Sequence, residues 1–200
     1  FIVMAPSNQE ELVKMIKTSA LINDFPSAFR YPRGAVNIFD NKIYKEIEIG
    51  KGQILVEGEK IAILSLGTRL ETCLDACIVL NDLNIKPTVA DARFAKPLDT
   101  DLIDHLLETH EFLVTIEEGS IGGFASHVLN YINNIRKKRT TTIIRNIFFQ
   151  DKFIDHMDPD DQYREVQMDI NSIIDKVTSL FDNKIIDIKN FNAKKVDKIV

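Results

Sequence analysis

Apolar residues along the chain follow two alternating patterns, short continuous runs and longer segments with helical spacing. Residues 60–66 and 112–116 are almost wholly apolar, which is typical of strands buried on both faces of a sheet. Between and after these runs, apolar residues recur every three or four positions, as on one face of a helix. Because strands alternate with helices, we expect a three-layer α/β domain with a mainly parallel sheet.

The same patterns place the individual elements. Strands are expected at residues 1–5, 27–31, 53–56 (an edge strand), 60–66, 87–92, 112–116 and 142–149. Helices are expected after Ser7, from Thr68 to about Leu83, after Asp99, after Gly122-Gly123, and over a last segment with Ile170, Ile173, Ile174, Val177 and Phe181. The first helix has a capping box, Ser7 and Glu10, and an inner face of Leu12, Met15 and Ile16. The inner face after Gly123 is Phe124, Val128, Ile132 and Ile135.

The chain divides into two blocks joined by a stretch without periodicity. We expect residues 1–37 to end one domain, 38–46 to form a linker, and 47–181 to form a second domain. Residues 182–200 are rich in Asn, Lys and Asp, and we expect a disordered tail to which we attach no function. Because Phe1 already lies in an apolar strand, we expect this chain to be the carboxyl-terminal piece of a longer protein.

Composition narrows the classes of partner. A net charge of −5 and a pI near 5.4 argue against nucleic acid, and the basic run 136–139 is typical of a solvated helix end or loop. No apolar run approaches the length of a membrane span, and the first residues lack the features of a signal peptide. Cys73 and Cys77 are one helical turn apart, which suits two small buried side chains better than a disulfide. These features predict a cytoplasmic protein.

Arg30 and Arg33 flank Tyr31-Pro32 at the end of the second expected strand, just before Gly34. A guanidinium group offers a rigid fork of donors that matches phosphate or carboxylate oxygens. Ligands of open α/β sheets bind beyond the carboxyl ends of strands, so an anionic ligand is expected here. Residues three apart in an extended chain face opposite sides, so one arginine should face the ligand and the other should pair internally. The alternative is that both are surface or ion-paired arginines at a turn.

Other candidate residues favour structural roles. The four histidines, 105, 110, 127 and 156, lack the spacing of a metal site. Glu117 and Glu118 are adjacent on a strand, so their side chains diverge and cannot flank one bond together; we expect one to pair with a basic residue or to cap the next helix. Gly122-Gly123 is too short for a dinucleotide fingerprint.

Five segments together carry a specific resemblance to a known family. They are Val-Met-Ala-Pro-Ser at 3–7, Arg-Tyr-Pro-Arg-Gly at 30–34, Asp-Ala-Arg-Phe-Ala-Lys-Pro-Leu-Asp at 91–99, Glu-Glu-Gly-Ser-Ile-Gly-Gly-Phe at 117–124 and Asp-Lys-Phe-Ile at 151–154. In this order the chain resembles, from Phe1 to about Phe181, the carboxyl-terminal third of the 1-deoxy-D-xylulose-5-phosphate synthase family of the transketolase superfamily. It departs from the family at Ala125, where glycine is usual, and at Phe149-Gln150, where Leu-Pro is usual.

The resemblance implies a transferase that uses thiamine diphosphate and a divalent cation, usually Mg²⁺. Family members are homodimers that condense pyruvate with glyceraldehyde 3-phosphate and release carbon dioxide. The product supplies non-mevalonate isoprenoid, thiamine and pyridoxal synthesis. By the same resemblance, residues 1–37 end the pyrimidine-binding middle domain and residues 47–181 form the transketolase carboxyl-terminal-like domain.

The resemblance also assigns site residues. Arg33 matches the arginine that grips the phosphate of glyceraldehyde 3-phosphate, and Arg30 would be its companion. No catalytic, cofactor-binding or metal-binding residue of the family falls within this chain, so their positions are expected in the missing part. Arg93 and Lys96 could face a dimer partner.

Two alternatives remain open from the sequence. The beta subunit of a 2-oxo-acid dehydrogenase shares the fold and a similar Pro-Leu-Asp loop, although Arg30-Tyr31-Pro32-Arg33-Gly34 is not expected there. The other alternative is a non-catalytic dimerisation or regulatory domain of the same fold.

Overall fold

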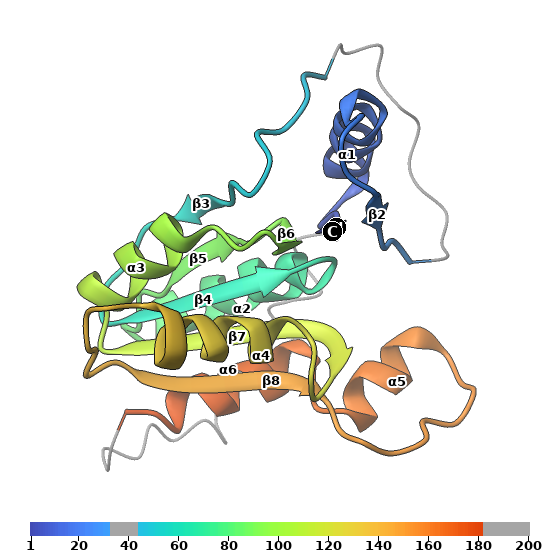
Figure 1. Cartoon of the computed structure of the whole chain (residues 1–200). Helices are drawn as coiled ribbons and strands as arrows, with labels where there is room; N and C mark the ends of the chain where they lie inside the picture. The colour runs from blue at the N-terminus through green and yellow to red at the C-terminus, as the bar shows by residue number, and fades with distance from the viewer. Residues whose placement is uncertain (33–43, 182–200) are drawn as a thin grey trace.

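The computed structural model describes residues 1–32 and 44–181 and contains two β-sheets (Figure 1). The larger sheet has the strand order β3-β5-β4-β7-β8, and the smaller has the order β2-β1-β6. None of the helices in the described ranges is long and apolar enough to span a bilayer.

The larger sheet is parallel except at one edge. Its strands are β3 (Gln53–Val56), β4 (Ile61–Leu66), β5 (Thr88–Asp91), β7 (Phe112–Ser120) and β8 (Ile143–Phe149). β4 pairs in parallel with β5 and β7, β7 pairs in parallel with β8, and only β3 runs antiparallel, beside β5. The predicted edge strand and the mainly parallel sheet are therefore confirmed.

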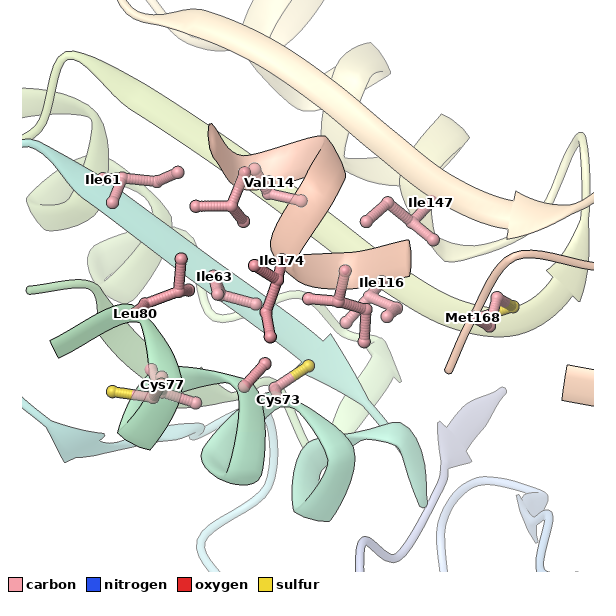
Figure 2. Close-up of a cluster of buried hydrophobic side chains, with 14 of the residues drawn as sticks. Ile61, Ile63, Cys73, Cys77, Leu80, Val114, Ile116, Ile147, Met168 and Ile174 are labelled. Atoms are coloured by element: carbon pink, nitrogen blue, oxygen red, sulfur yellow. The ribbon is translucent and has the colours of Figure 1, made fainter. Parts of the chain in front are cut away.

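Helices cover both faces of this sheet, as predicted. Alternate residues of a strand point to opposite faces, and β4 accordingly sends Ile61 and Ile63 to one core and Ala62 and Leu64 to the other. The first core is closed by α2 (Arg69–Asp82) and α6 (Ile170–Thr178), whose Cys73, Cys77, Leu80 and Ile174 surround the β4 isoleucines in Figure 2. The second core is closed by α3 (Thr100–Thr109) and α4 (Phe124–Asn130).

The smaller sheet joins the first block of the chain to the second. β1 (Ile2–Met4) pairs in parallel with β2 (Ser27–Phe29), and α1 (Gln9–Leu21) connects them. On its other side β1 pairs antiparallel with β6 (Phe94–Lys96), which follows β5 in the chain. Figure 1 shows that β1, β2 and α1 lie beyond the carboxyl ends of the larger sheet.

Several predicted details are wrong. Asn8, rather than Ser7, caps α1 by accepting a hydrogen bond from the Glu11 N–H, and Ser7 donates to Asp91 instead. The expected inner residue Ile16 is 47% exposed. Thr68 precedes α2 without a side-chain capping bond, and the expected inner residue Ile135 is exposed.

Some elements were not predicted from the sequence. They are β6, the short helix α5 (Pro159–Glu165) and the π-helical turn Tyr131–Ile135 that extends α4. Strand β7 also continues four residues beyond the predicted end, to Ser120.

Three predictions fall on residues outside the described ranges. They concern the substrate arginine Arg33, most of the linker, residues 38–43, and the tail, residues 182–200.

Candidate functional site

Arg30 follows β2 and reaches the carboxyl end of β7. Its backbone N–H donates to the Met4 carbonyl at 3.0 Å, and its guanidinium Nη1 donates to the Glu118 carbonyl oxygen at 2.8 Å. A carbonyl is neutral, and none of the described carboxylates forms an ion pair with Arg30. The Arg30 charge is therefore available to a ligand or to another part of the protein.

Two cavities meet at Arg30. One, of about 360 Å³, also has Thr68, Glu118 and Tyr163 in its lining, and the other, of about 250 Å³, lies between Ala5, Glu117 and the start of α4. Both are at the carboxyl edge of the larger sheet, which is where open α/β sheets bind their ligands. The structure places Arg30 at both cavities, and Arg33, the residue expected to bind the substrate phosphate, lies outside the described residues.

Glu117 holds the start of α4. Its Oε2 and Oε1 accept hydrogen bonds from the N–H groups of Phe124 and Ala125 at 2.9 and 2.8 Å, and the side chain is buried. A Cβ on Gly123 would lie 2.5 Å from Glu117 Oε2, so only glycine permits this approach. The expected capping role is confirmed.

Glu118 ties α5 to the sheet. Its Oε1 accepts from Thr68 Oγ1 at 2.6 Å, Arg69 Nε at 3.1 Å and Tyr163 Oη at 2.6 Å. The Arg69 guanidinium also lies 3.4 Å from the centre of the Tyr163 ring. Burial and the hydrogen bond to Glu118 raise the pKa of Tyr163 to about 12. The two adjacent glutamates therefore have separate structural roles.

A buried polar cluster links the two sheets. Ser7 Oγ donates to Asp91 Oδ2 at 2.7 Å, and the Arg93 side chain lies 2.8 Å from Glu11 Oε2 and donates to Gln53 at 2.7 Å. Burial raises the pKa of Asp91 to about 6, against the hydrogen bonds from Ser7 and the Arg93 N–H.

Sequence reasoning missed the Asp91 cluster, although an acid at the end of an apolar strand was a usable signal; Asp91 accepts from the Arg93 backbone N–H, and the Arg93 side chain contacts Glu11 and Gln53 instead. The Arg93 guanidinium pairs with Glu11 of the same chain, so the charge of Arg93 is compensated without a dimer partner. Lys96 is exposed.

His110 and the two cysteines occupy structural positions. Buried His110 has its Nε2 2.7 Å from Thr88 Oγ1, and burial lowers its pKa. Cys73 and Cys77 are buried and free, and burial raises the pKa of Cys73 to about 12, which makes it a poor nucleophile. Across residues 1–32 and 44–181, no three His, Cys, Asp or Glu side chains are grouped so that they could hold a metal ion.

The fold and the sequence define the class of protein. Residues 50–173 match the family described as "Transketolase, C-terminal domain", and the chain belongs to this family. Over 182 residues it is 44% identical to "Probable 1-deoxy-D-xylulose-5-phosphate synthase 2, chloroplastic" of Oryza sativa, which covers 90% of this chain and 26% of the relative. It is 47% identical to "1-deoxy-D-xylulose-5-phosphate synthase 1, chloroplastic" of Cannabis sativa over 165 residues, with coverages of 81% and 23%. The chain spans about a quarter of the length of these relatives.

Solved structures support the fold. A structure titled "Split gene transketolase, inactive beta4 tetramer" aligns with a TM-score of 0.77 at 24% identity and covers 89% of this chain and 57% of its own. The transketolase of Campylobacter jejuni aligns with a TM-score of 0.65 at 17% identity, with coverages of 90% and 26%.

The comparisons confirm one prediction and overturn another. The resemblance to the carboxyl-terminal part of 1-deoxy-D-xylulose-5-phosphate synthase is confirmed by both sequence relatives. The expectation of a cytoplasmic protein is wrong, because both relatives are described as chloroplastic. Composition and buried cysteines do not distinguish the cytoplasm from a plastid, because proteins are sorted to plastids by targeting segments and not by the composition of their folded domains.

Proposed function

We propose that this chain is the carboxyl-terminal part of a 1-deoxy-D-xylulose-5-phosphate synthase, which condenses pyruvate with glyceraldehyde 3-phosphate and releases carbon dioxide. The observation that carries the proposal is 44–47% identity to two such synthases over most of the chain. The same relatives favour this activity over that of a 2-oxo-acid dehydrogenase beta subunit. They also support a location in a plastid.

The cofactors belong to the part of the protein that precedes this chain. Thiamine diphosphate, held with Mg²⁺, would supply the stabilised carbanion equivalent that this condensation requires. In our proposal, thiamine diphosphate and Mg²⁺ are bound by residues outside this chain. A homodimer is likewise proposed from the family.

Arg30 and Arg33 are proposed to bind the phosphate of glyceraldehyde 3-phosphate. The support is that Arg30 lies at a cavity on the carboxyl edge of the sheet and is without a carboxylate partner among the described residues. A phosphate does not react in this condensation, so its binding energy can position the aldehyde.

Steady-state kinetics of the full-length protein test the activity and the two arginines. We expect Arg30→Ala and Arg33→Ala each to raise the KM for glyceraldehyde 3-phosphate by about 10- to 100-fold, because a charge-assisted hydrogen bond contributes about 1.5–3 kcal/mol. The KM for pyruvate should stay nearly unchanged. Arg139→Ala, which removes an exposed arginine before β8, is the control.

Two results would count against the proposal. Absence of condensation by the full-length protein with both cofactors would refute the activity. Equal changes in both KM values would remove the arginines from the phosphate site. Residues 1–200 alone should show no turnover.

A further inference from the structure

The guanidinium group of Arg30 is held by the backbone of the larger sheet. Its Nη1 donates to the carbonyl oxygen of Glu118 at 2.8 Å, although the two residues are 88 positions apart in the sequence. The Arg30 side chain makes no other hydrogen bond within residues 1–32 and 44–181, so its Nε and Nη2 donors stay available to a ligand. The position of the Glu118 carbonyl therefore determines where these donors point.

Regular strand pairing does not fix this carbonyl. The ladder between β7 and β4 ends at Glu117, and the ladder between β7 and β8 shifts its register between Ile116 and Ser120. Irregularities of this kind are common beside functional sites, where they redirect a side chain or end the pairing. The position of Glu118 at the end of β7 then depends on the contacts of its side chain.

The Glu118 side chain is tied to two helices that cover the sheet. Its Oε1 accepts three hydrogen bonds, from Thr68 and Arg69 at the start of α2 and from Tyr163 on α5. The Glu118 and Arg69 side chains are 16% and 13% exposed, so solvent screens their attraction only weakly. A carboxylate that three donors hold has little freedom to turn, and the backbone of the same residue is restrained with it.

We propose that Glu118 is a positioning residue, which orients the Arg30 guanidinium toward the bound substrate. This inference rests on the proposed function, in which Arg30 contacts the substrate. Glu118 acts through Arg30 and takes no part in bond making. Through this residue, α2 and α5 influence binding at an arginine that belongs to the first block of the chain.

A double-mutant cycle in the full-length enzyme tests this role. Glu118→Ala should raise the KM for glyceraldehyde 3-phosphate about tenfold, and by no more than Arg30→Ala does, because it acts only through Arg30. In the Arg30→Ala background, Glu118→Ala should have no further effect on this KM. The kcat and the KM for pyruvate should stay close to those of the natural protein. Glu118→Gln keeps an acceptor oxygen for the Thr68 and Tyr163 hydroxyls and should retain most of the affinity.

Glu108→Ala is the matched control. It also removes a carboxylate that pairs with basic side chains, Arg136 and Lys138, and it leaves the contacts of Arg30 and Glu118 in place. The control should not change either KM. If Glu118→Ala and Arg30→Ala have additive effects on the KM for the aldehyde, or if Glu118→Ala has none, the positioning role is wrong, because a general loss of structure would add to the loss of Arg30.

Binding of glycerol 3-phosphate, an unreactive analogue, separates this inference from the proposed function. Its Kd, measured by isothermal titration calorimetry, should show the same coupling between the two substitutions. A protein without condensation activity that still shows this coupling would refute the proposed function and support the positioning role. An active enzyme with additive effects would overturn the positioning role alone. A protein that neither catalyses the condensation nor binds the analogue would overturn both.

Discussion

Asp91 is the residue whose surroundings change its chemistry most clearly. It is fully buried at the end of β5, and burial raises the pKa of its carboxyl group from the usual 3.8 to about 6. The folded protein therefore holds this proton more tightly than the unfolded chain does. The contribution of Asp91 to the free energy of unfolding is complete below about pH 4 and is lost as the pH rises through about 6.

Replacing Asp91 with asparagine should remove this pH dependence. An amide can still accept from the Arg93 N–H and can donate to Ser7 Oγ, while it carries no charge at any pH. A pKa change of about two units corresponds to roughly 3 kcal/mol. We therefore expect the melting temperature of Asp91→Asn, compared with that of the natural protein, to change less between pH 4 and pH 6.5. Asp82→Asn, at an exposed position, is the control, and an identical pH profile for Asp91→Asn would contradict the argument.

At the scale of single elements, α5 depends on few contacts. None of its residues is buried, and Tyr163 joins it to the sheet through the hydroxyl bond to Glu118 and the contact with Arg69. Such elements open locally before the rest of a fold does. Because α5 lines the larger cavity through Tyr163, its stability affects the site as well.

Tyr163→Phe should loosen α5 while leaving the sheet intact. The substitution removes the hydroxyl bond to Glu118 and keeps the ring against Arg69, so the expected local cost is about 1.5 kcal/mol. Hydrogen exchange of residues 159–166 should become about tenfold faster in the variant, and exchange in β4 should not change. Tyr31→Phe, which removes an exposed hydroxyl from a ring stacked on Phe29, is the control. Unchanged exchange in α5 would show that other contacts hold it.

The elements that were predicted well are those with strong periodicity. Buried strands β4 and β7 and helices α2 and α6 have continuous or helical apolar patterns that the core enforces. The start of α1 was predicted one residue too early because Ser7 and Asn8 can both cap a helix, and the buried Asp91 engages Ser7. Strand β6 has three residues, too few for a periodic signal, and only its pairing with β1 makes it a strand.

The sequence led to a candidate site only where one motif contained it. A strand, a proline and a glycine around Arg30 and Arg33 predicted an anion site at the edge of a sheet, with Arg33 at the ligand, and this assignment stays a prediction. The Glu118 carbonyl reaches Arg30 from β7, and no local pattern indicates that the ends of β2 and β7 meet. Long-range pairing of this kind is determined by the tertiary fold.

For the whole molecule, the Glu11–Arg93 pair connects the block carrying α1 to the larger sheet. The two side chains are 4% and 12% exposed, so the Arg93 charge depends on Glu11 for compensation, while Glu11 also pairs with Lys14 at 3.0 Å. Removing one partner of a buried ion pair leaves an unpaired charge, which typically costs about 3–5 kcal/mol, whereas replacing both is tolerated better.

A double-mutant cycle in the full-length protein measures this coupling. Glu11→Gln and Arg93→Met should each speed hydrogen exchange in β1 and β6, and the double variant should be less affected than the sum of the two. Lys138→Gln, which removes the exposed pair with Glu108, should leave β1 and β6 unaffected. Simple additivity would show that the pair contributes no coupling between the two blocks.

Because β6 pairs with β1, a strand within the segment that matches the family forms its hydrogen bonds with a strand outside that segment. The segment that matches the family begins at residue 50, yet one of its strands completes its ladder with residues near the start of the chain. A recombinant fragment that begins at residue 50 would leave the backbone N–H and C=O groups of the three-residue strand β6 without their partners in β1. An exposed strand edge of this kind can pair with another molecule and promote aggregation. A shortened protein that retains the first thirty residues would keep this edge of β6 paired with β1.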